Sequence, residues 1–420
     1  MTDALPPLPP GEGWGEGRGA ALASSRAPAP HPGPLPGGAR EKIRCDVAII
    51  GGGIVGSSAA LFLRRLGLSV VLLERGLCGA AASGVNYGGV RVQGRPVSQL
   101  PLALRARRIW ENLRQHIGID GEYVRSGHLK LARSPADLAA LEAYAATVRE
   151  HGLALELSSG ASFRRANPWV GDQAVGGSIC ADDGHANPRL VSPAFARAAQ
   201  AAGARVIEHC AVTEIAHTGS GFVVGDGRTV EVRSTTLLNC AGAWSLAVAE
   251  RFGDTAPLTA IHPGMCVTEP VPRFIDVNVG VEGGGIYGRQ TARGNCVMGG
   301  SRGAASGGLY AVPTAKAIGE LCQRMGDLFP ALAHAHVIRF WSGVEGSLPD
   351  HQPVISPSLR VPNLVHAFGF CGAGFQTGPA VGEVLAELVH RGEPPIALDA
   401  FSLARFSSPA FTTTPQGALT

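Results

Sequence analysis

Three arginines and one tyrosine are the residues with which this chain could hold a small anionic molecule. Arg91 and Arg95 stand in the segment GGVRVQGR, and Tyr287 and Arg289 stand in the segment GIYGRQ. A guanidinium group is planar and matches a carboxylate with two parallel hydrogen bonds, to which a tyrosine hydroxyl can add a third. The alternative for each arginine is a surface or structural ion pair. These four residues are our candidates for binding and orienting a substrate carboxylate.

A glycine-rich turn, GGGIVG, indicates a second kind of chemistry, the binding of a diphosphate. Gly51 permits a tight turn, Gly53 lets the backbone approach a pyrophosphate, and Gly56 lets the following helix lie close to the strand. The N-terminus of that helix adds free N–H groups and the positive end of its dipole. Glu74 can accept hydrogen bonds from both hydroxyls of a ribose. The motif alone does not separate NAD from FAD.

The elements around this turn follow the order strand, helix, strand. Residues 46–50 form a short apolar run that ends in glycines, which is typical of a buried parallel strand. Helical spacing of apolar residues predicts a helix that begins near Ile54 and ends near Gly67, and LSVVLLE predicts a second strand. Such an arrangement within about thirty residues is the βαβ nucleotide-binding unit.

Two further glycine turns stand far from the first. The segment NCAGAWS follows a predicted strand, and GFCGAGFQTGPAVGEVLAEL is a turn that opens the last helix. Between the first and second turns, Asn187 and Pro188 predict the start of another helix. Three distant glycine turns at strand ends favour one extended ligand, and the C-terminal turn argues against a nicotinamide dehydrogenase.

Composition excludes several classes of protein. The formal net charge is +3 and basic residues form no blocks, so nothing indicates nucleic-acid binding. No apolar run is long enough to span a membrane. The nine cysteines are scattered and include no CxxC pair, which argues against disulfides and a zinc ribbon and favours the cytoplasm. No metal-ligand motif is present, so we expect no catalytic metal.

The quoted segments resemble the FAD-dependent amine oxidoreductases of the D-amino-acid oxidase superfamily. The resemblance covers about residues 44–406 and is carried by GGGIVG with Glu74, ASGVNYGGVR, DDGHANPRL, NCAGAWS, WSGVEGSLPDHQPVI and GFCGAGFQTGPAVG. Within the superfamily the chain is most similar to the branch that contains glycine oxidase, the β chain of sarcosine oxidase and the B chain of opine oxidase. These motifs together are specific for the superfamily but not for a substrate.

The resemblance implies that FAD binds along the three turns. The first turn would hold the pyrophosphate, Glu74 the adenosine ribose, and the backbone of Val212 the adenine. Residues 372–376 would surround the pyrimidine end of the isoalloxazine, where N–H groups and a helix dipole would stabilise the reduced flavin anion. The cofactor-binding residues we predict are Gly51, Gly53, Ile54, Val55, Gly56, Glu74, Arg75, Ser83, Gly88, Gly89, Val212, Ala241, Gly242, Trp244, Gly372, Ala373, Gly374, Phe375 and Gln376.

The chain departs from the family pattern at three places. The C-terminal turn usually reads GHG, but here Ala373 replaces the histidine. Some sarcosine oxidases carry a lysine where Gln376 stands. Some relatives attach FAD through a cysteine before the PDHQPVI motif, whereas residues 341–345 contain none. The last departure predicts non-covalent FAD.

The predicted fold class is α/β, with an FAD-binding Rossmann-like domain of the glutathione-reductase type and a second α+β substrate domain on an antiparallel or mixed sheet. At 420 residues the chain exceeds what one hydrophobic core usually supports. The predicted divisions are a disordered Pro- and Gly-rich tail at 1–40, an FAD-binding domain at 41–105, 185–250 and 345–406, a substrate domain at 106–184 and 251–344, and a tail at 407–420.

The implied activity is FAD-dependent oxidation of the C–N bond of a small amino acid. The substrate would be a D-amino acid, glycine, or an N-substituted amino acid such as sarcosine, an opine or D-hydroxyproline. Hydride would pass to flavin N5, the imine would hydrolyse, and oxygen or an electron carrier would reoxidise the flavin, with partner subunits in opine-oxidase-like relatives. The alternative is a non-catalytic or electron-transferring flavoprotein subunit of a heteromeric dehydrogenase.

Overall fold

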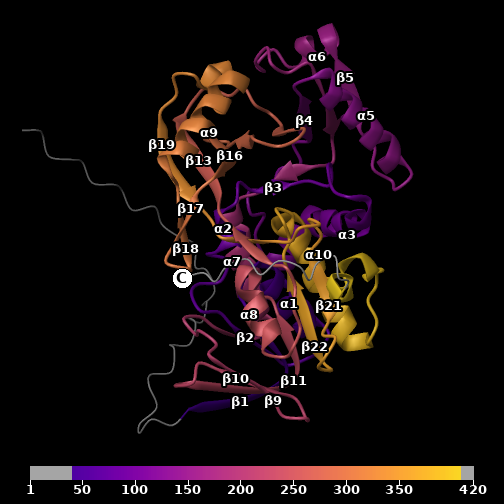
Figure 1. The fold of residues 1–420 in the computed structure, drawn as a ribbon, viewed down its shortest axis with the longest axis vertical. Coiled ribbons are helices and arrows are strands. Elements are labelled where there is room, and N and C mark those ends of the chain that lie inside the picture. The colour runs from indigo at the N-terminus through magenta and orange to yellow at the C-terminus, as the bar shows by residue number, and fades with distance from the viewer. Residues whose placement is uncertain (1–39, 408–420) are drawn as a thin grey trace, which may run out of the picture. The chain divides into compact units, whose positions relative to one another are not determined.

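Two eight-stranded sheets organise the computed structural model, which describes residues 40–407. The predictions for tails at 1–40 and 407–420 lie outside these residues, apart from Arg40 and Ser407. Figure 1 shows the strands of one sheet, including β1 and β11, at the lower end and those of the other, including β13 and β16, at the upper end. Among residues 40–407, no helix is both long enough and apolar enough to cross a membrane.

The first sheet carries the predicted βαβ unit. Its strand order is β21-β22-β11-β1-β2-β8, and β10 pairs with β11 while β9 pairs with β10. The pairs β22–β11, β11–β1, β1–β2 and β2–β8 are parallel. The strands are β1 (Glu41–Ile50), β2 (Val70–Leu73), β8 (Arg205–Ile207), β9 (Glu214–His217), β10 (Phe222–Gly225), β11 (Val230–Asn239), β21 (Val354–Pro357) and β22 (Leu364–Phe368). The predicted strand at 46–50 is confirmed as the buried end of β1.

Helices α1 (Ile54–Arg65), α3 (Leu100–Glu111), α7 (Pro188–Ala201) and α10 (Gly374–Arg391) pack together beside this sheet. Helix α7 begins as predicted, because the side chain of Asn187 accepts a hydrogen bond from the backbone of Arg189. Small residues bring α1 and α10 into direct contact. A β carbon on Gly382 would lie 2.5 Å from the backbone nitrogen of Ala59, and the Ser58 hydroxyl donates to the Gly378 carbonyl at 3.1 Å.

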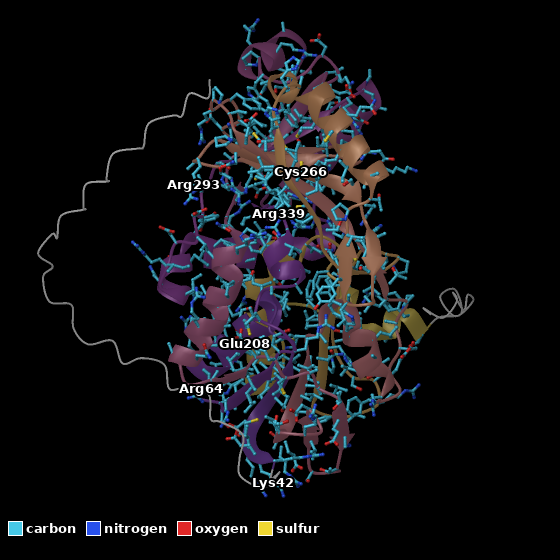
Figure 2. The ribbon with its side chains drawn as sticks, turned by 90° about the vertical axis from the view of Figure 1, so that its left-hand side faces the viewer. Lys42, Arg64, Glu208, Cys266, Arg293 and Arg339 are labelled. Carbon is cyan, nitrogen blue, oxygen red and sulfur yellow. The ribbon has the colours of Figure 1, made fainter. Side chains whose placement is uncertain are left out.

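The second sheet is mixed, in agreement with the predicted fold class. Its order is β19-β13-β16-β15-β14-β4-β6-β5, in which only the β14–β4 pair is parallel. The strands are β4 (His128–Ala132), β5 (Glu156–Ser159), β6 (Gly176–Cys180), β13 (Pro263–Pro270), β14 (Asn278–Val281), β15 (Tyr287–Gln290), β16 (Asn295–Arg302) and β19 (Val337–Ser342). Figure 2 marks Cys266 in β13, within the core of this sheet, and Lys42 in β1 of the other.

Shorter elements complete the two sheets. Helices α5 (Pro135–Arg149) and α6 (Gly160–Ala166) contact β6, and α9 (Ala315–Leu328) packs on β16. The remaining elements are α2 (Ala82–Val85), α4 (Leu113–Ile117), α8 (Ser245–Glu250), β3 (Gly89–Val90), β7 (Gly184–His185), β12 (Thr259–Ile261), β17 (Ala304–Ser306), β18 (Tyr310–Val312) and β20 (Glu345–Ser347).

One predicted domain boundary divides a helix. The boundary between residues 105 and 106 lies inside α3, whose residues Ala106, Ile109 and Trp110 are buried in the hydrophobic core around α1. Leu113 of α4 belongs to the same core. The amphipathic face of α3 therefore continues the first core past the predicted boundary. The rest of the division stays a prediction.

Candidate active site

A cavity of about 650 Å³ lies between the two sheets. On one side it is lined by residues that follow the carboxyl ends of β1, β2, β11 and β22, the edge at which parallel α/β sheets bind ligands. On the other side it is lined by residues of β4, β13, β14 and β15 in the second sheet. One ligand could therefore touch both halves of the structure.

The turn between β1 and α1 leaves no room for side chains. Gly51 has a φ of +105°, and a β carbon there would lie 2.3 Å from the carbonyl oxygen of Cys240. A β carbon on Gly56 would lie 2.0 Å from the carbonyl oxygen of Gly51. The N-cap residue of α1 is Gly53, which supplies no capping side chain, and the first turn contains no acidic residue. The N–H of Ile54 donates to the Ser83 hydroxyl at 2.9 Å, and the positive end of α1 faces the cavity with no acidic residue of its own first turn.

Glu74 lies beside this turn with its carboxylate held by the backbone. Its oxygens accept hydrogen bonds from the N–H groups of Gly52 at 2.7 Å and Gly76 at 2.8 Å. The guanidinium carbon of Arg75 lies 3.5 Å from the centre of the Trp244 ring, and both residues line the cavity. This end offers an oriented carboxylate and a flat cation–aromatic surface.

Helix α10 presents a second N-terminus at the cavity. Its N-cap residue, Ala373, supplies no capping side chain, and no acidic residue occupies its first turn. The preceding turn is held by Glu345, which accepts a hydrogen bond from the backbone of Gly372. Burial raises the pKa of Glu345, and the Gly372 hydrogen bond opposes part of that rise.

Most of the predicted cofactor-binding residues meet at this cavity. Those that line it are Gly51, Gly53, Ile54, Val55, Glu74, Arg75, Ser83, Gly89, Val212, Ala241, Gly242, Trp244, Gly372, Gly374 and Phe375. Gly56, Gly88, Ala373 and Gln376 lie outside the lining. Gly56 and Gly88 are needed for close packing, since β carbons there would meet backbone oxygens at 2.0 Å.

The side chain of Gln376 points away from the cavity lining. Its side chain is 1% exposed and donates from Nε2 to the carbonyl of Ala103 at 2.9 Å. Its backbone oxygen accepts from the indole of Trp110 at 2.8 Å. Gln376 therefore joins α10 to α3 instead of facing the cavity, because in α10 its side chain projects toward α3.

Of the four predicted substrate-binding residues, Arg91, Arg95 and Tyr287 line the cavity and Arg289 does not. Arg289 is 6% exposed, and its Nε donates to the carbonyl of Tyr87 at 2.7 Å. The Tyr87 and Tyr287 rings lie 4.6 Å apart by their centroids, and both line the cavity. Arg289 thus supports the backbone of Tyr87 through its Nε.

Arg95 is the least compensated charge at this end of the cavity. It is 6% exposed, and within residues 40–407 its guanidinium group has neither a hydrogen-bond partner nor an ion pair. Burial, and next the charge of Arg91, lower the pKa of Arg95 to about 9. A buried guanidinium of this kind is strongly stabilised by an anionic ligand.

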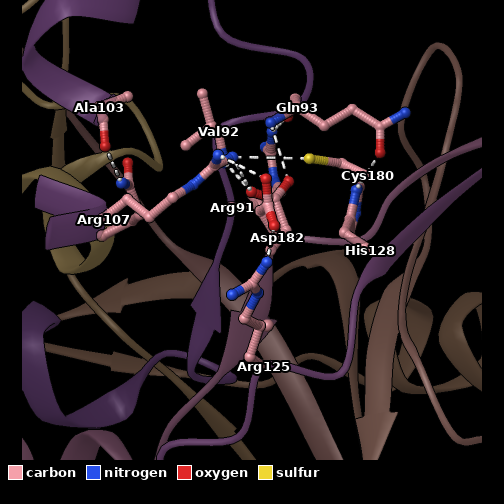
Figure 3. Close-up of polar contacts among 12 residues, drawn as sticks. Arg91, Val92, Gln93, Ala103, Arg107, Arg125, His128, Cys180 and Asp182 are labelled. Atoms are coloured by element: carbon pink, nitrogen blue, oxygen red, sulfur yellow. Dashed lines mark hydrogen bonds and ion pairs between the residues drawn. The ribbon is translucent and has the colours of Figure 1, made fainter. Parts of the chain in front are cut away.

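The loop that carries Arg91 and Arg95 is fixed by Asp183, which does not line the cavity. The carboxylate of Asp183 accepts from the backbone N–H groups of Val92 at 2.8 Å and Gln93 at 2.9 Å, and Arg107 lies 3.2 Å from it. Figure 3 shows Arg107 reaching toward this loop and Asp182. The arginines are therefore positioned before any ligand arrives.

The cavity also contains His128 and Lys130, which our sequence reasoning missed. Nδ1 of His128 lies 2.9 Å from Oε1 of Gln93, whose Nε2 donates to the Ser178 carbonyl at 3.1 Å. Nδ1 therefore carries the proton and Nε2 is left as an acceptor. Burial, followed by the charges of Arg91 and Lys130, holds the pKa of His128 well below its usual value. Polar and apolar residues alternate in the segment HLKLA, which places both polar residues on one face of a strand. This alternation is the sequence signal that could have identified His128 and Lys130.

A sequence model of the DAO family, described as FAD dependent oxidoreductase, matches residues 46–388. The chain belongs to this family. It is therefore an FAD-dependent oxidoreductase, and the predicted flavin cofactor is confirmed over a nicotinamide.

Curated proteins match most of the chain. The β chain of the sarcosine oxidase of Rhizobium meliloti is 28% identical, and the match covers 86% of this chain and 88% of the relative. The glycine oxidase of Geobacillus kaustophilus is 27% identical, and the match covers 86% and 97%. The crystal structure of a glycine oxidase from Geobacillus kaustophilus is 25% identical, has a TM-score of 0.80 and covers 86% of this chain and 99% of that one.

The residues of this FAD-dependent oxidoreductase fit its cofactor. Two helix N-termini with no acidic residue in their first turns meet one cavity, where they suit the pyrophosphate and the reduced flavin. The carboxylate of Glu74 stands where it could accept hydrogen bonds from a ribose, and the turn at Gly51 excludes side chains that would block a phosphate. Among residues 40–407, no cluster of three or more His, Cys, Asp and Glu residues could hold a metal ion.

Proposed function

We propose that this enzyme oxidises the C–N bond of a small amino acid whose carboxylate binds to Arg95. The substrate classes of the relatives support the reaction, since they are named for sarcosine, glycine and opines. The observation that carries the proposal is the buried guanidinium of Arg95, which lines the cavity and has no partner among residues 40–407.

Tyr287 completes this carboxylate site, and Arg91 lines the same end of the cavity. Nη1 of Arg91 donates to the carbonyl of Gln93 at 2.6 Å, which fixes the direction of its guanidinium group. Burial raises the pKa of Tyr287 above its usual value, so the hydroxyl remains a neutral donor. Charge-assisted hydrogen bonds from these groups would orient the amino acid along the cavity.

FAD, when bound, supplies the acceptor for the hydride that leaves the substrate carbon. The chain must receive the proton of the substrate ammonium group, because only the neutral amine has a lone pair to assist. His128 lines the cavity with Nε2 free to accept, and its depressed pKa keeps it neutral near pH 7. A bound substrate carboxylate would offset the nearby cations and make His128 a better acceptor.

Anaerobic mixing of the flavin-loaded enzyme with D-amino acids, glycine and N-alkyl amino acids tests this proposal. We expect at least one of them to bleach the visible flavin absorbance. Repeating the reaction with oxygen and with an artificial acceptor identifies the oxidant. Flavin that dithionite reduces but no amine bleaches would contradict the proposal.

That contrary result would favour a second function, an electron-transferring subunit of a heteromeric dehydrogenase. Two observations support this alternative. Several relatives are named as subunits, and Ala373 replaces the histidine of the usual C-terminal turn.

A further inference from the structure

Positive charge exceeds negative charge at the substrate end of the cavity. Arg91, Arg95 and Lys130 all line it. Lys130 forms an ion pair with Glu282, which offsets one charge. Two guanidinium groups then remain without a carboxylate partner among residues 40–407.

Nearby acids do not supply the missing charge. Asp183 lies behind the loop, where it is occupied by Arg107 and two backbone N–H groups. Glu345 lines the cavity, but it accepts from Gly372, and burial raises its pKa toward the neutral form. A ligand must therefore provide the compensating anions.

Arg91 and Lys130 converge on one place. Nη1 of Arg91 lies 3.1 Å, and Nζ of Lys130 lies 3.4 Å, from the point that a β carbon on Gly94 would occupy. Glu282 offsets the charge of Lys130, whereas Arg91 has no carboxylate partner among residues 40–407, so an anion beside both would compensate chiefly Arg91. A carboxylate that binds Arg95 alone leaves Arg91 without an anionic partner among residues 40–407.

We infer that the substrate carries two carboxylates, the first bound by Arg95 and the second by Arg91 with Lys130. This inference rests on the proposed function and narrows its substrate class to acidic amino acids. The second carboxylate belongs either to an N-carboxyalkyl group or to the amino-acid side chain. Glycine and sarcosine, with one carboxylate each, would leave Arg91 without an anionic partner.

Matched substrate pairs that differ by one charge test the inference. N-(carboxymethyl)glycine is compared with N-(carbamoylmethyl)glycine, and D-glutamate with D-glutamine, in flavin reduction. We expect the diacid of at least one pair to have a kcat/KM about 30-fold or more above its amide, as expected for a charge-assisted contact in a buried site. Equal kcat/KM values within both pairs would overturn the inference while leaving the proposed function intact.

Binding without turnover separates the two proposals. Thiodiacetate and (methylthio)acetate carry two and one carboxylates but no amine to oxidise. We expect thiodiacetate to perturb the spectrum of the flavin-loaded enzyme at a Kd about 30-fold lower or more. Equal Kd values would overturn the dicarboxylate site. Tighter thiodiacetate binding in an enzyme that no amine reduces would instead support the site and contradict the proposed function.

Substitution of Lys130 tests its role directly. K130M is expected to remove most of the preference for the diacid over its amide, while K130R restores that preference. The control is K316M, since Lys316 has an 86% exposed side chain on α9. A K130M enzyme that keeps the full preference would contradict the assignment of Lys130.

Discussion

The two ends of the cavity are built from different parts of the polypeptide. At the β1–α1 end, the backbone itself forms the site, through glycines that admit no β carbon and a helix N-terminus. At the second-sheet end, the site consists of side chains from β4, β15 and the loop after β3, and it depends on how their charges are balanced. The first end fits the cofactor common to the family, and we propose that the second determines what this chain oxidises.

This difference implies that substitutions at the two ends of the cavity should have different effects on the enzyme. Backbone crowding at the first end should abolish flavin binding. Changes of charge at the second end should alter substrate use while flavin stays bound.

The largest effect is expected from G56V. The new β carbon would lie 2.0 Å from the Gly51 carbonyl oxygen, so α1 would have to move away from β1. We expect purified protein with no bound flavin and a loss of more than about 3 kcal/mol in unfolding free energy. The flavin-to-protein absorbance ratio and thermal unfolding measure both. G319A, in α9 with nothing within 4 Å, is the control and should retain flavin and stability.

A smaller effect is expected behind the substrate loop. D183A removes a 1% exposed carboxylate that holds two backbone N–H groups and Arg107. Arg107 keeps its ion pair with Asp182, so the loss of this carboxylate from two buried N–H groups and from Arg107 should cost about 2–3 kcal/mol in unfolding free energy, measured by denaturant titration. The fully exposed Asp172 provides the comparison, since D172A should change stability by less than about 0.5 kcal/mol. Equal losses in both variants would refute the supporting role of Asp183.

R95M should show most clearly that a substitution at the second-sheet end of the cavity affects substrate use and leaves flavin binding unchanged. Loss of the unpartnered guanidinium should lower kcat/KM by about 100-fold or more, with the flavin content unchanged. R289M removes another buried arginine, one that contacts the Tyr87 carbonyl and does not line the cavity. We expect R289M to lower the free energy of unfolding and to change substrate affinity less than R95M does. If R95M keeps normal kinetics, the carboxylate site lies elsewhere.

The smallest effect concerns Glu345. Because burial raises its pKa above the usual 4.5, the folded state holds this proton more tightly than the unfolded chain does. The resulting stability is fully present below about pH 4.5 and is lost as the pH rises through the folded-state pKa. E345Q should therefore match the wild type in acid and become more stable than it, by about 1 kcal/mol, as the pH rises toward 8. Thermal melts of the flavin-loaded enzymes across this range would show the crossover, and parallel curves would contradict it.

The sequence predicted the first end of the cavity well because its determinants are local. The strand at 46–50, the helix from Ile54 and the turn at Gly51 follow from residue types within one short segment. The mixed second sheet and the family also followed from the resemblance.

The second end was predicted only in part because its residues meet through tertiary structure. The direction of a side chain in β15 decides that Tyr287 lines the cavity and Arg289 contacts Tyr87. His128 depends on Gln93 and Ser178 from two other segments. Gln376 follows the C-terminal turn as expected, but the helical phase of α10 directs it to Ala103. No pattern within one short segment of the sequence predicts these contacts.

The close crossing of α1 and α10 has a consequence for cofactor choice. Each helix begins at the cavity, and their contact through Gly378 and Gly382 leaves little freedom to change the spacing between their starts. The distance between a bound phosphate and a bound isoalloxazine ring is therefore set by the protein before the cofactor arrives. FMN has the same ring-to-phosphate link as FAD, so a preference for the dinucleotide has to come from the adenosine end, where Glu74 and the Arg75–Trp244 pair lie.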